Sequence, residues 1–167
     1  MDEDIVGLGP AQRKSEQLTI DHLDLKILRH LLANGRLSFR QLASDLHVST
    51  TTVASRVARL ERDGVIKGYS TSVDFQGLGY DLTVVTEIQV SKGRLVEMER
   101  EIAKMPGVCA VYDVTGELDA MVISKCRNRE ELSRFTKGLL ALPFIERTNS
   151  HVVLTTVKED FRLPLYT

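Results

Sequence analysis

The sequence predicts an α+β protein built from an N-terminal winged helix-turn-helix followed by a ferredoxin-like βαββαβ domain. Three observations support this prediction. Two helical patterns separated by a three-residue turn lie within residues 38–68. Residues 82–157 then alternate between strand-like and helix-like patterns in the order β-α-β-β-α-β. Positive charge is concentrated in residues 21–70.

The first domain is predicted to contain three helices. Residues 21–33 and 39–46 each follow a good N-cap residue and carry apolar side chains at helical spacing. The turn 47–49 leads into a third helix, which ends near Gly64. A turn of this length sets two helices at the steep angle used to enter the major groove of DNA. Residues 65–69 would follow as a turn that enters a short extended strand, the wing.

The third helix carries different chemistry on its two sides. Val53, Val57 and Leu60 form an apolar stripe that should pack inward. The remaining side chains are hydroxyls, which allow close approach to bases, and arginines, which bind guanine edges or phosphates. The predicted DNA-contacting residues are Arg40, Ser49, Thr50, Thr51, Thr52, Ser55, Arg56, Arg59 and Arg62. Two alternatives remain open: a merely solvated helix face, and an internal ion pair between Arg56 and Asp24.

Charge supports this interpretation locally. The whole chain has 22 Lys and Arg against 23 Asp and Glu, a net charge of −1, which argues against indiscriminate nucleic-acid binding. Residues 21–70 carry eight basic and five acidic side chains, a net charge of +3. Residues from 71 onward carry 12 basic and 14 acidic side chains, a net charge of −2. Electrostatics therefore favours DNA contact through the first domain only.

The second domain is predicted from its strands and helices. We expect strands at 82–90, 108–115, 120–126 and 145–157, and helices at 94–105 and 128–142. In a ferredoxin-like fold both helices cover one face of a four-stranded antiparallel sheet. The first and last strands carry apolar or β-branched groups on both sides, so the helix-free face should also be covered. A second subunit would supply that cover.

Several short motifs in this order resemble the Lrp/AsnC family of prokaryotic transcription regulators. They are Ile20-Asp21-His22-Leu23-Asp24, Ile27-Leu28, Asn34-Gly35-Arg36-Leu37-Ser38, Leu42-Ala43, Val48-Ser49, Arg56-Val57-Ala58-Arg59-Leu60-Glu61 and Gly64-Val65-Ile66-Lys67-Gly68-Tyr69. The resemblance covers residues 20–160. It implies a sequence-specific regulator of double-stranded DNA that responds to a small metabolite, an amino acid, and forms homodimers that commonly assemble into octamers. Residues 1–19 depart from the pattern because they are longer than the family's usual N-terminus.

These observations divide the chain into four segments. Residues 1–19 form a polar extension, for which a mobile tail is the favoured interpretation. Residues 20–81 form the DNA-binding domain with a linker strand, and residues 82–160 form the domain for effector binding and oligomerisation. Residues 161–167 form a C-terminal tail.

The turn between the second and third expected strands, 108–115 and 120–126, is the candidate effector loop. Gly116 permits a positive φ, and Asp119 offers a carboxylate to an ammonium group. From the residues alone, an ordinary hairpin turn is the favoured reading. The resemblance favours a ligand loop, completed by the last strand of a neighbouring subunit. The residues implied are Gly116, Glu117, Leu118, Asp119, Thr148, Asn149 and Ser150, with Ala120 where the family usually has tyrosine.

Other classes of protein are disfavoured by the sequence. No segment reaches the roughly 20 apolar residues of a membrane span, and the acidic start does not match a secretory signal, so a cytoplasmic protein is expected. Cys109 and Cys126 lack metal-ligand spacing, and no phosphate loop or catalytic triad is present, so neither a metal, a cofactor nor an enzymatic activity is expected. Two alternatives stay open on the same architecture: a tetrapyrrole (siroheme-type) decarboxylase subunit and an effector-independent DNA-architectural protein.

Overall fold

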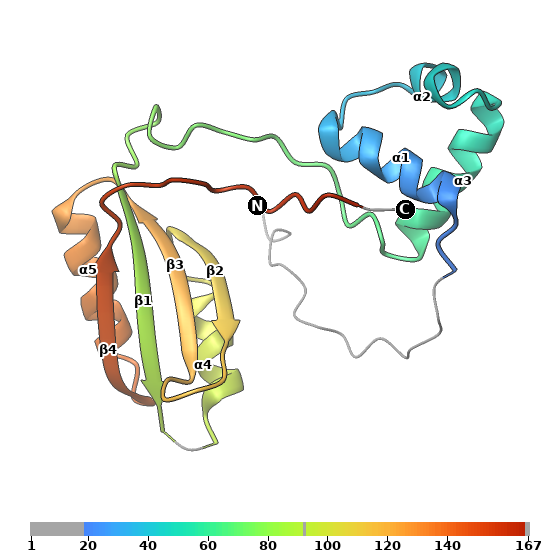
Figure 1. Cartoon of the computed structure of the whole chain (residues 1–167). Coiled ribbons are helices and arrows are strands. Elements are labelled where there is room, and N and C mark those ends of the chain that lie inside the picture. The colour runs from blue at the N-terminus through green and yellow to red at the C-terminus, as the bar shows by residue number, and fades with distance from the viewer. Residues whose placement is uncertain (1–18, 92, 166–167) are drawn as a thin grey trace, which may run out of the picture. The chain divides into compact units, whose positions relative to one another are not determined.

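The structure is a computed structural model that describes residues 19–91 and 93–165 (Figure 1). The chain divides into two compact units. Of the described residues, 19–72 and 159–165 belong to one unit, and those from Val73 to Lys158 belong to the other. The polar extension predicted for the N-terminus lies, up to residue 18, outside the described residues.

Three helices form the first unit: α1 (His22–Ala33), α2 (Phe39–Leu46) and α3 (Thr50–Arg62). Each begins at a side chain that caps it. Asp21 and Asp24 form a reciprocal capping box on α1, Ser38 accepts from the backbone of α2, and Ser49 accepts from that of α3. The three predicted helices and their caps are therefore confirmed.

The core of this unit consists of side chains from all three helices, namely Ile27, Leu42, Ala43, Val53, Val57 and Leu60. Ala43 is small and buried, and α2 and α3 pack against each other. The turn between them reverses at His47, whose φ of 56° is left-handed. After α3, Gly64 adopts a φ of 65°, the conformation expected of a residue that closes a helix.

The strand predicted for the wing is not formed. In the described part of the chain, residues 65–72 are not in a strand and form no ladder with another described segment. The amides of Val65 and Ile66 instead donate to the carbonyl of Leu60, at 2.8 and 3.0 Å, and so close the end of α3. An extended stretch becomes a strand only when a neighbouring strand accepts its hydrogen bonds, which the sequence pattern alone does not reveal.

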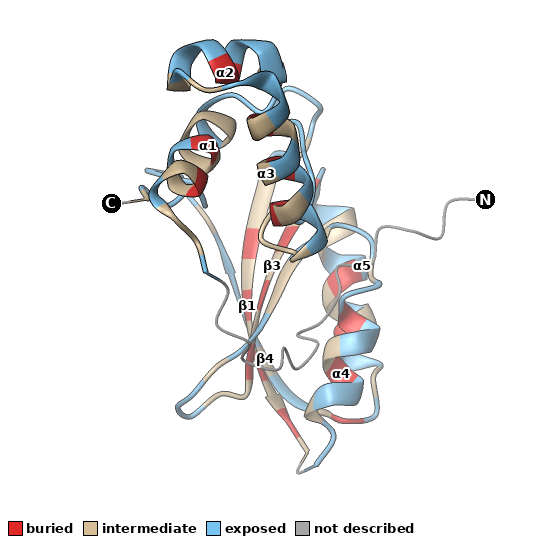
Figure 2. Cartoon of the chain, turned by 90° about the vertical axis from the view of Figure 1, so that its right-hand side faces the viewer, coloured by how far each residue is buried: buried red, intermediate tan, exposed pale blue. Residues whose placement is uncertain are grey.

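The second unit is a four-stranded antiparallel sheet with the order β2-β3-β1-β4 (Figure 1). Its strands are β1 (Leu82–Val90), β2 (Val108–Asp113), β3 (Ala120–Cys126) and β4 (Ile145–Val152). Residues along β1 alternate between buried and partly exposed, which Figure 2 shows as alternating colours. The buried positions pack on the helices, and the alternate positions Thr83, Val85, Glu87 and Gln89 form the helix-free face.

Helices α4 (Leu95–Ile102) and α5 (Arg129–Leu140) cover one face of the sheet. Between the helices and the sheet lies a core formed by Ile88, Val90, Met98, Ile102, Ala120, Val122, Phe135, Leu139 and Phe144. Helix α4 is shorter than the predicted 94–105. The last turn tightens, with Met105 donating to Ile102 at 2.9 Å, because the residue before Pro106 is disfavoured in the helical region.

The last strand is also shorter than the predicted 145–157. Strand β4 pairs with β1, and β1 begins at Leu82. The final bond runs from the Val153 amide to the Thr83 carbonyl, at 2.9 Å, so later residues have no strand to pair with. Beyond that point, Leu154 and Val157 are almost fully exposed.

The boundary between the two units lies between Ser72 and Val73, whereas we expected it between residues 81 and 82. Residues from Val73 belong to the second unit, where the rings of Phe75 and Tyr80 meet edge to face at 5.9 Å. The Tyr80 hydroxyl accepts from Arg127 at 3.2 Å. Residues 159–165 belong to the first unit, where the Arg29 side chain donates to the carbonyl of Leu165.

Candidate functional site

The outer side of α3 is an exposed face of small, hydroxyl-bearing and basic side chains. Thr51, Ser55, Ala58 and Arg62 are exposed and lie opposite the buried stripe of Val53, Val57 and Leu60. The side chain of Arg62 is 72% exposed. Of the other predicted DNA-contacting residues, Arg40, Ser49 and Thr50 are exposed, whereas Thr52, Arg56 and Arg59 are partly covered.

The start of α3 is organised by its own hydroxyl groups. The Ser49 hydroxyl accepts from the Thr52 amide at 3.0 Å and lies 2.8 Å from the Thr52 hydroxyl. The Ser55 hydroxyl donates to the Thr52 carbonyl at 3.0 Å. Ser49 and Thr52 therefore fix the first turn, and Thr50 and Thr51 remain the outward hydroxyls at the helix N-terminus.

Arg56 and Arg59 turn toward α1. Arg56 pairs with Asp21 and also donates to Asp24 at 3.2 Å, and Arg59 pairs with the other oxygen of Asp24. Asp24 is fully buried, while the two arginine side chains are 30% and 33% exposed. The internal pair between Arg56 and Asp24 that the sequence left open is thus formed, and Arg59 shares it. Both arginines therefore hold α3 against α1, and their contact with DNA stays a prediction.

Asp21 gives this ion-pair cluster a pH dependence. The amide of Asp24 and then the guanidinium of Arg56 lower the Asp21 pKa from 3.8 to about 2. A lowered pKa stabilises the fold at pH values above about 4, and this contribution is lost as the pH falls toward about 2.

Asp21→Asn keeps a cap acceptor but cannot titrate. Between about pH 4 and pH 2 we expect urea denaturation to show a steeper loss of stability for the wild type than for Asp21→Asn. Parallel curves would contradict this.

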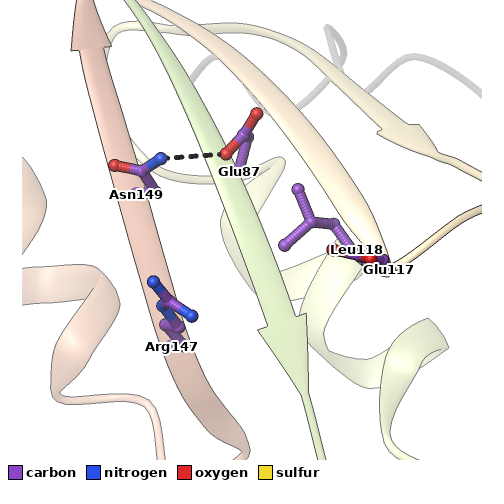
Figure 3. Close-up of a pocket in the computed structure, with 5 residues that line it drawn as sticks. All are labelled: Glu87, Glu117, Leu118, Arg147 and Asn149. Carbon is purple, nitrogen blue, oxygen red and sulfur yellow. Dashed lines mark hydrogen bonds between the residues drawn. The ribbon is translucent and has the colours of Figure 1, made fainter.

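The second candidate site is a pocket on the helix-free face of the sheet, drawn in Figure 3. It has a volume of about 170 Å³, and its lining residues are Glu87, Glu117, Leu118, Arg147 and Asn149. These residues come from β1, from the turn between β2 and β3, and from β4. The structure therefore brings together the turn and the last strand of one chain, whereas the resemblance implied the last strand of a neighbouring subunit.

Only part of the predicted effector set lines this pocket. Glu117, Leu118 and Asn149 do, whereas Thr148 and Ser150 lie on the opposite face. Ser150 is paired with Thr86, and their hydroxyl oxygens lie 3.0 Å apart on the helix-covered side. Successive residues of a strand point to opposite faces, so three consecutive residues cannot all line one site.

Asp119 has a structural partner. Its carboxylate accepts from the Val90 amide at 2.7 Å, and its own amide donates to the Ile88 carbonyl at 3.0 Å. These bonds attach the turn to β1 where the pairing with β4 shifts register. Gly116 has a φ of 129°, which favours glycine, and nothing lies within 4 Å of where a Cβ would be. Gly116 and Asp119 thus shape the turn that presents Glu117 and Leu118.

The sequence did not single out Glu87 or Arg147. Glu87 accepts from the Asn149 amide at 3.1 Å and lies 3.5 Å from the His151 imidazole. Arg147 precedes Asn149 by two residues, so the period of a strand was the available signal for it. Glu87 could be found only by knowing that β1 pairs with β4 in the register that sets it opposite Asn149.

Over residues 19–91 and 93–165, no group of three or more His, Cys, Asp or Glu side chains is arranged to hold a metal ion. No helix in the same part of the chain is long and apolar enough to span a membrane.

Each of the two units matches a known protein family. Residues 20–67 match the winged helix-turn-helix DNA-binding model, and residues 83–163 match the Lrp/AsnC ligand binding domain. An HTH-type transcriptional regulator of Pyrococcus horikoshii is 47% identical over 87% of this chain and 99% of its own length.

Solved structures agree with this match. AsnC of E. coli superimposes with a TM-score of 0.81 at 26% identity, over 87% of this chain and 99% of that one. A regulator from Neisseria meningitidis, solved as a complex with L-Met, gives a TM-score of 0.80 at 25% identity, over 87% of this chain and 97% of that one. With its helix-turn-helix unit and its ligand-binding sheet domain, the chain belongs to the Lrp/AsnC family of transcriptional regulators.

Proposed function

We propose that this regulator binds double-stranded DNA through the outer face of α3 and changes its affinity for DNA when an amino acid binds at the pocket on its sheet. The observation that carries the DNA-binding part is the exposed stripe of Thr51, Ser55, Ala58 and Arg62 opposite a fully buried one. Small and hydroxyl-bearing side chains allow the helix to lie close to base edges.

The two ends of α3 have different roles in this proposal. In helix-turn-helix proteins the N-terminal part of the second helix contacts base edges and the first helix crosses the backbone. Thr50, Thr51 and Ser55 are therefore assigned to bases. Arg62 in the last turn and Arg40 on α2 are assigned to phosphates. Arg56 and Arg59 act indirectly, because their ion pairs hold α3 at a set angle to α1.

Arg62→Ala tests the phosphate assignment. Because phosphate contacts carry no sequence information, we expect weaker binding to every DNA sequence and a log-log salt slope reduced by about 0.9 for each α3 helix bound to DNA. Anisotropy titrations at several salt concentrations measure both quantities. Arg134→Ala, an exposed arginine on α5, is the matched control and should change neither. An unchanged salt slope for Arg62→Ala would contradict the assignment.

The amino-acid part of the proposal rests on the pocket and on the family. The chain has the family's ligand-binding domain, and a structural relative was crystallised with L-Met. The pocket contains both a guanidinium, which binds carboxylates, and carboxylates, which bind ammonium groups. Those are the two ends of a free amino acid.

Self-association is the third part of the proposal. On the helix-free face, β1, β3 and β2 present Val85, Ile123, Met121 and Tyr112, of which the first three are only partly covered and Tyr112 is 43% exposed. A second copy packed on this face would bury these groups and close the pocket. A two-fold dimer would present two α3 helices, so DNA sites should contain two half-sites about 34 Å apart or a multiple of that spacing.

A further inference from the structure

The charges of the pocket narrow the class of amino acid that fits it. Three of its five lining side chains carry a formal charge: the carboxylates of Glu87 and Glu117 and the guanidinium of Arg147. The other two, Leu118 and Asn149, are neutral. The lining therefore carries one negative charge more than it carries positive charge.

The guanidinium is available to a ligand. Among the described residues no carboxylate or carbonyl accepts a hydrogen bond from Arg147, and its side chain is exposed. In Figure 3, Arg147 and Asn149 project from β4 beside Glu87 on β1, and Leu118 reaches toward them from the turn. Arg147 is thus placed to bind the carboxylate of a small molecule held against the sheet.

The two carboxylates are not equivalent. Glu87 already accepts from Asn149 at 3.1 Å, with His151 3.5 Å away, so it is held in place. Glu117 lies at the tip of the turn, is exposed, and has no ion pair within residues 19–91 and 93–165. A neutral amino acid would pair its carboxylate with Arg147 and its ammonium with one glutamate. The other glutamate would then be left without a counter-charge when a second subunit closes the pocket, which is unfavourable.

We infer that the effector is an amino acid with a cationic side chain, of the lysine or arginine type. This inference rests on the proposed function, because it names the class of ligand for that same pocket. The ligand carboxylate binds Arg147, and its two cationic groups bind Glu87 and Glu117. A volume of about 170 Å³ suits a single small molecule, since a cavity of about 150 Å³ accommodates benzene. Acidic ligands would bring a surplus of negative charge to both glutamates.

Four compounds separate the contributions of these groups by calorimetry on the full-length protein. L-Lysine carries all three charges, L-norleucine lacks the side-chain cation, cadaverine lacks the carboxylate, and L-glutamate reverses the side-chain charge. We expect lysine to bind most tightly and norleucine and cadaverine each to bind at least about tenfold more weakly, the usual effect of losing a charge-assisted hydrogen bond. Glutamate should show no binding.

Glu117→Gln removes one carboxylate and keeps the size of the side chain. It should weaken lysine binding by about tenfold or more. It should not weaken norleucine binding, because the carboxylate that norleucine leaves without a counter-charge is gone, so lysine loses its preference. Glu146→Gln, an exposed neighbour on β4 that does not line the pocket, should change neither. Thermal unfolding midpoints equal to that of the wild type check that both variants are folded.

The outcomes distinguish this inference from the proposed function. Norleucine binding as tightly as lysine, or lysine binding unaffected by Glu117→Gln, would overturn the cationic class while leaving amino-acid sensing in place. Cadaverine binding as tightly as lysine would overturn the role of Arg147. No binding by any of the twenty amino acids would overturn the amino-acid part of the proposed function itself, and DNA binding through α3 would be unaffected.

Discussion

Asp24→Ala should destabilise the helix-turn-helix unit by about 3 kcal/mol, at the lower end of the range for breaking a buried ion pair. Asp24 is fully buried, and its two oxygens pair with Arg56 and Arg59. It also accepts from the Asp21 amide at 3.0 Å and so completes the cap of α1. The two arginines left behind are about one-third exposed, so water reduces the cost of leaving them unpaired.

Urea denaturation followed by far-ultraviolet circular dichroism measures this loss. Asp45→Ala is the matched control, since Asp45 is an exposed acid on α2 whose only described bond is to Gln41 at 2.8 Å. It should cost less than about 0.5 kcal/mol. A loss below about 1 kcal/mol for Asp24→Ala would mean that the ion pairs do not hold α3 against α1.

Ser55→Glu should weaken DNA binding by more than about 100-fold without unfolding the protein. Ser55 is exposed at the centre of the proposed face, and a carboxylate there would be held against phosphates and base edges, where like charges cost several kcal/mol. Ser55→Gln adds similar bulk without charge and should cost much less. The comparison therefore separates charge from size.

Anisotropy titration with labelled DNA measures these affinities, and Ser133→Glu on the exposed side of α5 is the control for added charge elsewhere. Equal affinity for the wild type and Ser55→Glu would remove the outer face of α3 from the DNA interface.

The elements of the fold could be predicted because their signals are local. The caps Asp21, Ser38 and Ser49 and the spacing of apolar residues determined the helices to within a residue or two. The α+β architecture and the family were confirmed as well. The predictions that failed concern segments whose structure depends on pairing with another strand. Among the residues that the structure describes, the wing segment has no neighbouring strand, and β4 ends where β1 begins.

The side chains of the sites were harder to predict, because their directions depend on contacts between distant segments. Arg56 and Arg59 have the composition of a DNA-reading face, but their partners lie on α1, about 35 residues earlier in the chain. A run such as Thr148-Asn149-Ser150 resembles one site in the sequence, yet the alternation of a strand places only Asn149 at the pocket. Glu87 lies at the pocket because β1 pairs with β4, and no local sequence pattern encodes that pairing. The DNA-contacting and effector-binding assignments stay predictions.

The most direct test of the whole account is the dissociation constant for DNA measured with and without a bound amino acid. The DNA is a duplex selected in vitro by the full-length protein, and the amino acid is the one that most raises the thermal midpoint. Because DNA and effector binding are linked, we expect at least a fivefold change in the dissociation constant for wild-type protein. The change should disappear in Arg147→Ala, which leaves the α3 face intact. An amino acid that binds at this pocket but leaves the affinity for DNA unchanged would contradict the account.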